Sequence, residues 1–235
     1  MKTIGLIGGL SWESTATYYR LINEEVKRRL GGLHSARLIL YSVDFAEIEG
    51  LQSAGQWTQA GAILSSAAVA LQSAGAECVV LTTNTMHKVA DQIEAAVDLP
   101  FLHIADCTAA AIVGQGIQVV GLLGTRYTME QAFYKDRLTE KFGLRVLTPP
   151  QPERETVHRI IYEELCRGEV RADSRQAYQA ILSGMAQEGA EGIILGCTEI
   201  SMLLGPQHSD LPLFDTAAIH ALAAVNWSLA ATFPS

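Results

Sequence analysis

The chain has 235 residues, enough for one large domain or two small ones, with 49% hydrophobic and 18% charged residues. This composition is typical of a soluble globular protein with a well-filled core. The formal net charge of −8 argues against nucleic-acid and membrane-surface partners, because neither is drawn electrostatically to an acidic chain. No apolar run is long enough to predict a membrane-spanning helix.

Cysteine usage indicates a reducing compartment. The four cysteines have neither C-x-x-C nor zinc-ligand spacing, so no metal site is expected: Cys78, Cys107, Cys166 and Cys197. A strand ending in glycines follows the first lysine, which does not resemble the apolar core of a signal peptide. We therefore expect a cytoplasmic protein with reduced thiols.

The first half of the chain alternates predicted strands and helices. Strands are expected at 3–8, 37–43, 78–81 and 99–103. Ser11 is expected to cap a helix that reaches about Leu30, and residues 44–50 are expected to form a loop. Further helices are expected at 57–74, from Asn84 or Thr85, and from Asp106.

The second half repeats this alternation. Strands are expected at 118–123, 144–147, 190–196 and 211–214, and helices within 125–142, 153–166 and 173–187 and from Thr216 onward. Strands that alternate with helices predict an α/β fold made of parallel sheets with helices on both faces.

Four short segments recur in the same order at nearly constant spacing. Residues 190–199 resemble 76–85, residues 120–125 resemble 4–9, residues 211–213 resemble 99–101, and residues 133–135 echo 18–20. Such self-similarity predicts two pseudo-symmetric lobes. We place them at 1–105 and 106–215, with a C-terminal helix 216–235 packed back on the first. Thr83 then occupies the place of Cys197, and the two would flank one interlobe cleft.

Cys197 ends a buried apolar run, at the strand edge where open α/β sheets bind ligands. If a helix begins directly after it, the helix N-terminus would lower the thiol pKa and favour the reactive thiolate. The alternative is a buried structural cysteine. The glycine segment 5–9 lacks the dinucleotide fingerprint and a phosphate-loop lysine. That loop favours a tight turn or a small anion over a nucleotide.

Several motifs together resemble one known family. Residues 83–85 (T-N-T) and 196–199 (G-C-T-E) resemble the paired C-N-T and G-C-T motifs of the aspartate/glutamate racemases. Residues 8–15, 43–45 and 214–220 resemble its other signatures, so the resemblance covers essentially the whole chain. It is strongest to a bacterial branch in which Thr replaces the first catalytic Cys.

This resemblance implies racemisation of aspartate or glutamate in a site between two α/β lobes, no cofactor, and a homodimer. It implies that Cys197 removes the α-proton while the group opposite, here Thr83, returns one to the other face. A hydroxyl is a poor base at neutral pH, so we expect a preferred enantiomer. Candidate substrate contacts are Ser11, Gln52, Asn84, Thr85, Thr125, Thr198 and Glu199.

Each candidate contact except Asn84 could equally be a helix cap or a solvated turn residue. Glu199 could hold the substrate ammonium, and Arg126, Lys135 or Arg167 could hold a distal carboxylate. His87 follows Thr83 by one helical turn, where a capping or helix-face role is the commoner one. His103 and His220 are expected in the core or directly behind the residues that line the site.

Two other functions stay open at this point. A single thiol would also suit a decarboxylase or isomerase of the same superfamily. A degenerate, non-catalytic amino-acid-binding protein would explain Thr83 but not an intact Cys197 motif. A PLP enzyme is disfavoured, because lysines are few and no phosphate cup is evident.

Overall fold

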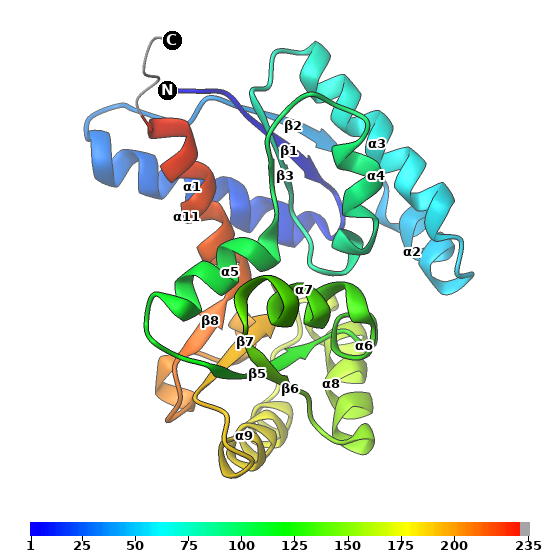
Figure 1. The fold of residues 1–235 in the computed structure, drawn as a ribbon, viewed down its shortest axis with the longest axis vertical. Helices are drawn as coiled ribbons and strands as arrows, with labels where there is room; N and C mark the ends of the chain where they lie inside the picture. The colour runs from blue at the N-terminus through cyan, green and yellow to red at the C-terminus, as the bar shows by residue number, and fades with distance from the viewer. Residues whose placement is uncertain (231–235) are drawn as a thin grey trace. The chain divides into compact units, whose positions relative to one another are not determined.

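The structure, a computed structural model, describes residues 1–230 and divides into two compact units. Of the described residues, unit 1 comprises 1–103 and 220–230, and unit 2 comprises 104–219. The end of the helix predicted for 216–235 lies outside the described residues. Each unit is an α/β layered structure around one parallel sheet, as the alternating pattern predicted (Figure 1).

The sheet of unit 1 has the strand order β2-β1-β3-β4. Its strands are β1 (Ile4–Gly8), β2 (Leu38–Ser42), β3 (Cys78–Leu81) and β4 (Phe101–Leu102). Ile4 pairs with both Leu38 and Cys78, so β1 lies between β2 and β3. The central strands β1 and β3 are buried throughout, which explains their uninterrupted apolar sequences.

Helices cover both faces of this sheet. One face packs against α2 (Phe45–Ser53), α3 (Trp57–Ser73) and α4 (Ala90–Glu94), which follows the 3-10 helix η1 (Thr85–Val89). The other carries α1 (Trp12–Leu30) and the end of α11 (Thr216–Leu229), whose ribbons cross in Figure 1. Hydrogen bonds join these two helices, from Tyr18 to His220 and from Arg29 to Asn226.

The loop predicted at 44–50 is wrong, because α2 occupies this segment. Asp44 caps the helix by accepting a hydrogen bond from the Ala46 N–H at 3.1 Å. Ile48 and Gln52, one turn apart, are the buried residues of α2. A helix of nine residues has only these two buried positions, and one of them is polar, so the sequence shows no apolar periodicity here.

Unit 2 repeats the architecture with the strand order β6-β5-β7-β8. Its strands are β5 (Val119–Gly124), β6 (Arg145–Leu147), β7 (Gly192–Gly196) and β8 (Leu213–Asp215). One face packs against α8 (Gln151–Glu163), α9 (Ala172–Gln187) and α10 (Ile200–Leu203), and the other against α5 (Ile104–Val113) and α7 (Ala132–Phe142). Shorter elements are α6 (Arg126–Glu130), η2 (Leu165–Arg167) and η3 (Pro206–His208).

The two sheets confirm the internal repeat. Strands β5, β6, β7 and β8 take the places of β1, β2, β3 and β4 in an identical order. Thr83 follows β3 and Cys197 follows β7, so the two residues occupy equivalent strand ends in their own units.

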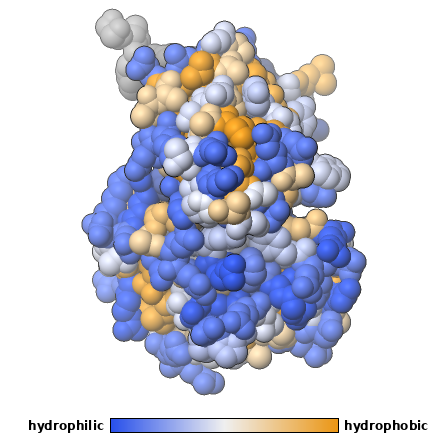
Figure 2. All heavy atoms as spheres, turned by 90° about the vertical axis from the view of Figure 1, so that its right-hand side faces the viewer, coloured by the Kyte–Doolittle hydropathy of each residue, from blue (hydrophilic) through white to orange (hydrophobic). Residues whose placement is uncertain are grey.

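The surface is mainly hydrophilic on the face that Figure 2 shows, with apolar residues gathered in smaller patches. Among residues 1–230, no helix combines the length and the apolarity needed to cross a bilayer.

His220 makes the stability of unit 1 sensitive to acid. Burial lowers the pKa of His220 to about 4, whereas the unfolded chain titrates near pH 6.5. The unfolded state therefore binds the proton first, and stability is lost as pH falls from about 6.5 toward 4. We expect wild-type protein to lose about 2–3 kcal/mol between pH 7 and pH 4.5 through this group. Denaturant titrations give the free energy of unfolding of wild type and of His220→Gln at each pH. If this free energy fell equally with pH in both proteins, the role of His220 would be contradicted.

Candidate active site

The carboxyl ends of β1 and β3 gather the predicted site residues of unit 1 at one edge of its sheet. The Thr82 N–H donates to the Ile7 carbonyl at 3.0 Å, and the Ser14 hydroxyl donates to the Thr82 carbonyl at 3.2 Å. These bonds join the start of α1 to the end of β3. The predicted residues placed in this region are Ser11, Gln52, Thr83, Asn84 and Thr85.

The turn after β1 has a constrained backbone. Gly9 has φ +81°, and a Cβ there would lie 2.1 Å from the Val43 carbonyl oxygen, so only glycine fits. Ser11, at φ 82°, is the only non-glycine residue among residues 1–230 with positive φ. Its hydroxyl accepts from the Ser14 N–H at 3.3 Å, which caps α1. The Gly9 N–H donates to Thr15 Oγ1 at 2.9 Å, so this N–H is already hydrogen-bonded within the protein and does not point to a bound anion.

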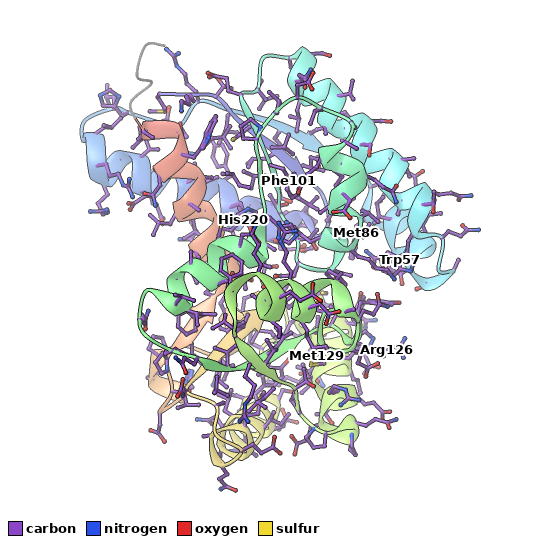
Figure 3. All side chains as sticks on the ribbon, viewed as in Figure 1. Trp57, Met86, Phe101, Arg126, Met129 and His220 are labelled. Atoms are coloured by element: carbon purple, nitrogen blue, oxygen red, sulfur yellow. The ribbon has the colours of Figure 1, made fainter. Side chains whose placement is uncertain are left out.

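Gln52 connects α2 to the segment that follows Thr83. It is buried, and its Nε2 lies 2.8 Å from the sulfur of Met86 in η1. Met86 is labelled in Figure 3. Asn84 and Thr85, at the start of η1, are also buried, whereas Thr83 is half-buried. Thr83 belongs to no helix or strand, since β3 ends at Leu81 and η1 begins at Thr85.

Paired glycines bring the strand ends of unit 2 close together. Gly124 and Gly196 are register partners at the ends of β5 and β7. A Cβ at Gly124 would lie 2.8 Å from the Gly196 carbonyl oxygen, so side chains would force these strand ends apart. Thr125 and Cys197 follow directly after the two glycines. The same edge therefore carries Thr125, Cys197, Thr198 and Glu199.

A buried carboxylate lies against the thiol. The Cys197 thiol donates to Glu199 Oε2 at 3.0 Å, and the Thr198 hydroxyl donates to the same oxygen at 2.7 Å. Glu199 is 6% exposed, while Cys197 and Thr198 are half-buried. Cys197 thus has an adjacent hydrogen-bond acceptor for its thiol proton.

The expected lowering of the thiol pKa is wrong for this state of the protein. Burial, and then the negative charge of Glu199, raise the pKa of Cys197 well above its usual value. The following helix, α10, has only four residues and begins at Ile200. So few aligned peptide dipoles cannot offset a neighbouring carboxylate. Cys197 is therefore protonated at neutral pH, and it can act as a base only after another group has accepted its proton.

Of the three candidate cations, Arg126 follows Thr125 directly at this edge. Thr125 caps α6 by accepting from the Thr128 N–H at 3.4 Å. The exposed Arg126 donates its backbone N–H to Nδ1 of His158 at 3.2 Å. Lys135 lies on α7, and Arg167 is an exposed residue of η2.

Sequence reasoning missed the contacts of three side chains near these strand ends. Lys88 in η1 places its ammonium 3.9 Å from the ring centroid of Trp57, a cation–π contact. His87 bonds the carbonyl of Thr83 at 2.7 Å. Glu199 was considered for the substrate ammonium and not as a partner of Cys197. The only signals in the sequence were that Glu199 lies two residues after Cys197 and that His87 lies four residues after Thr83. Neither spacing specifies which atoms form a hydrogen bond.

Comparison with known proteins bears on the family and the fold of this chain. The family model described as Asp/Glu/hydantoin racemase matches residues 7–224. A Yersinia pestis crystal structure, provisionally named an Asp/Glu racemase, is 60% identical, with 97% of this chain and 100% of that chain covered and a TM-score of 0.93. An aspartate racemase homologue from Pyrococcus horikoshii OT3 is 36% identical, with 97% and 99% covered and a TM-score of 0.84.

Among curated proteins, the broad-specificity amino-acid racemase RacX of Bacillus subtilis (strain 168) is 26% identical over 170 residues, 69% of this chain and 70% of that protein. The family model matches nearly the whole chain, and the structure has two repeated α/β units in which a polar motif follows a central strand. The chain belongs to the Asp/Glu/hydantoin racemase family.

Proposed function

We propose that this protein racemises an acidic amino acid, aspartate or glutamate, by cofactor-independent transfer of the α-proton. The observation that carries the proposal is the Cys197–Glu199 contact at the end of β7, at the strand end equivalent to the one that Thr83 follows. Inverting a stereocentre needs a base and an acid on opposite faces of the α-carbon. The proposal requires one substrate to meet Cys197 and Thr83 in this way.

The contact suggests where the thiol proton goes. As substrate binds, the proton on Cys197 Sγ passes to Glu199 Oε2, which leaves a thiolate beside a neutral carboxylic acid. The thiolate takes the α-proton and becomes a thiol again, while the electron pair stays on the substrate as a carbanion. Sharing one proton avoids two adjacent negative charges, which the raised thiol pKa shows to be unfavourable.

Thr83 completes inversion in this scheme. Its hydroxyl, or a water that it orients, supplies a proton to the face of the carbanion opposite Cys197. Solvent then returns a proton to this side, and Glu199 releases the proton that it received, so the site regains its starting protonation. A hydroxyl is a far weaker base than a thiolate, so the bound enantiomer that must lose its α-proton toward Thr83 turns over more slowly, with kcat and KM lowered in the same proportion because kcat/KM is equal for two enantiomers of equal free energy. The two directions then differ in kcat and KM, while the equilibrium between enantiomers is unchanged. The replacement of a first catalytic Cys by Thr83 is part of this proposal.

We assign the substrate contacts by chemistry. The side chains of Asn84 and Thr85 and the N–H of Thr198 offer donors to the α-carboxylate, and Glu199 offers its other oxygen, Oε1, as an acceptor for the ammonium. Arg126 is our choice for a distal carboxylate, because it follows Thr125 and is exposed. Ser11, Gln52 and Thr125 have structural partners in this state, so we assign them to shaping the site.

The test follows the α-proton directly. The protein is incubated without added cofactor with each enantiomer of aspartate and glutamate in deuterium oxide. Loss of the α-proton signal and chiral composition are measured together. Exchange with inversion supports a racemase. A higher turnover of one enantiomer at saturating concentration supports the unequal roles of Cys197 and Thr83. Exchange without inversion would contradict the role of Thr83.

Absence of exchange with all four substrates would overturn the proposed function. A single-thiol decarboxylase or isomerase would then be tested with malonate-type and unsaturated dicarboxylic acids. Amino-acid binding by calorimetry without exchange would indicate a non-catalytic binding protein. The homodimer, the cytoplasmic location and the absence of nucleic-acid and membrane partners stay predictions.

Replacing Glu199 with Gln is expected to have opposite effects on thiol reactivity and on turnover. Removing the negative charge lowers the Cys197 pKa, so alkylation by iodoacetamide at neutral pH becomes faster. Removing the proton acceptor is expected to slow α-proton exchange about 100-fold. The pH profile of alkylation and the exchange rate are measured on the same samples.

Glu191→Gln is the matched control, because it makes the same change at the other end of β7. Glu191 is exposed and accepts from the Gln118 and Val119 N–H groups. Neither alkylation nor exchange is expected to change in that variant. A Glu199→Gln variant with a wild-type exchange rate would show that Glu199 does not take the thiol proton.

A further inference from the structure

The backbone of Thr83 is held on both sides although the residue lies outside any helix or strand. Its N–H donates to the Leu81 carbonyl at 2.9 Å, and its carbonyl accepts from Nδ1 of His87 at 2.7 Å. The N–H of His87 also donates to the Asn84 carbonyl at 3.1 Å. His87 therefore closes the turn that carries Thr83 with both its backbone and its side chain.

The imidazole of His87 is itself fixed by a cluster of rings inside unit 1. His87 is 3% exposed. Its ring centroid lies 4.5 Å from that of His103, 5.5 Å from Phe101 and 6.0 Å from His220, all in edge-on arrangements. Figure 3 labels Phe101 and His220. A ring packed on several sides cannot turn away from Thr83 without opening the core.

Hydrogen bonding determines which nitrogens carry protons in this cluster. A carbonyl only accepts, so Nδ1 of His87 must be protonated to bond Thr83. His220 bonds the Leu102 carbonyl through Nε2 at 2.6 Å, so its Nδ1 accepts from the Tyr18 hydroxyl at 2.9 Å. Burial keeps His220 uncharged at neutral pH, with its pKa lowered to about 4. The neighbour of His87 is thus a neutral ring of defined tautomer.

The three histidines do not form a metal centre. Within residues 1–230, no group of three His, Cys, Asp or Glu side chains is placed to hold one ion. The cluster connects η1, the segment after β4, α11 and α1 through packing and hydrogen bonds. Its contact nearest the proposed chemistry is the bond from His87 to the Thr83 carbonyl.

We propose that His87 is a positioning residue that holds Thr83 in place for proton delivery, through the hydrogen bond from its Nδ1–H to the Thr83 carbonyl. This inference rests on the proposed racemase function. Thr83 lies outside any helix or strand, so its backbone depends on the bonds to Leu81 and His87, and proton transfer is sensitive to displacements of about 1 Å. His87 supports only the Thr83 side of the reaction, so its loss should affect inversion more than α-proton removal by Cys197.

The experiment measures how the carbanion is partitioned. In deuterium oxide, deuterium returned from the Cys197 side gives exchange with retention, and a deuteron delivered from the Thr83 side gives exchange with inversion. The ratio of inversion to retention is measured with the enantiomer that wild type exchanges faster. We expect His87→Ala to lower this ratio about tenfold while total exchange changes much less. A general loss of structure would lower both pathways together.

Two amide variants refine the test. Asn places its side-chain N–H near the position of Nδ1, whereas Gln places it near Nε2. His87→Asn is therefore expected to keep the ratio within about twofold of wild type, and His87→Gln to lower it about as much as Ala. Ile93→Ala is the packing control, because it removes a fully buried side chain from the core of unit 1 and leaves His87 and its ring neighbours in place, so its ratio should match wild type.

The outcomes separate this proposal from the one it rests on. If His87→Ala fails to fold, the comparison of Asn with Gln decides, and equal ratios in those two variants would overturn the proposal. Equal ratios in wild type and His87→Ala would overturn it too. Wild-type protein that exchanges no α-proton would overturn the racemase function first, and with it the role given to Thr83 and His87.

Discussion

Replacing Cys197 with Ala is expected to abolish α-proton exchange with every enantiomer of aspartate and glutamate, a loss of at least about 1,000-fold. Cys197 is the thiol that adjoins a buried carboxylate at the carboxyl end of a central strand. Alanine has no group that can remove the α-proton, and in the proposed mechanism Glu199 acts on the substrate only through the Cys197 thiol. The measurement is loss of the α-proton signal in deuterium oxide.

Cys166→Ala serves as the matched control. Cys166 is also half-buried and packs against the same core cluster as Cys197, so its replacement makes a comparable change in volume. We expect it to retain exchange within about twofold, since a half-buried structural cysteine behaves as a small hydrophobe. If the two variants lost activity equally, packing rather than chemistry would explain the effect of Cys197→Ala.

Replacing Thr83 with Cys is expected to raise turnover of the disfavoured enantiomer by about tenfold or more. A thiol at this strand end can form a thiolate, which a hydroxyl does not do at neutral pH. Both faces of the α-carbon would then meet a group able to act as base. Initial rates from each pure enantiomer, followed by chiral separation, give the ratio of the two directions.

Thr83→Ser separates acidity from size. Serine offers a hydroxyl in place of a thiol and lacks only the methyl group of threonine, so it should not raise the disfavoured direction. No gain with Thr83→Cys, in a variant that still exchanges the preferred enantiomer, would show that the asymmetry does not come from Thr83. The final ratio of enantiomers must stay the same in all variants, because a catalyst does not change the equilibrium.

Much of the fold could be predicted from sequence because its determinants are local or repeated. Central strands such as Gly192–Gly196 are buried on both faces and read as uninterrupted apolar runs. Helix α1 was predicted from the Ser11 cap and its apolar stripe, and the structure has it at Trp12–Leu30. By contrast α2 was missed, because its two buried positions gave too short a pattern.

The site was predictable as a set of residues and not as a set of contacts. The position of Cys197 at a strand end followed from the apolar run before it, and its equivalence to Thr83 followed from the repeat. Its protonation did not follow, because the raised pKa depends on burial and on a carboxylate oxygen 3.0 Å away. A Glu two residues along the chain can point in any of several directions until the turn is formed.

The sequence by itself determined that the protein is α/β, that it contains two copies of one pattern, and that polar motifs end equivalent strands. These properties depend on hydrophobic periodicity and on short-range order, which composition and spacing express directly. Only the tertiary structure decided that Glu199 accepts from Cys197 and that His87 holds the Thr83 carbonyl. Those contacts depend on side-chain rotamers and tautomers, which packing selects after the chain has folded.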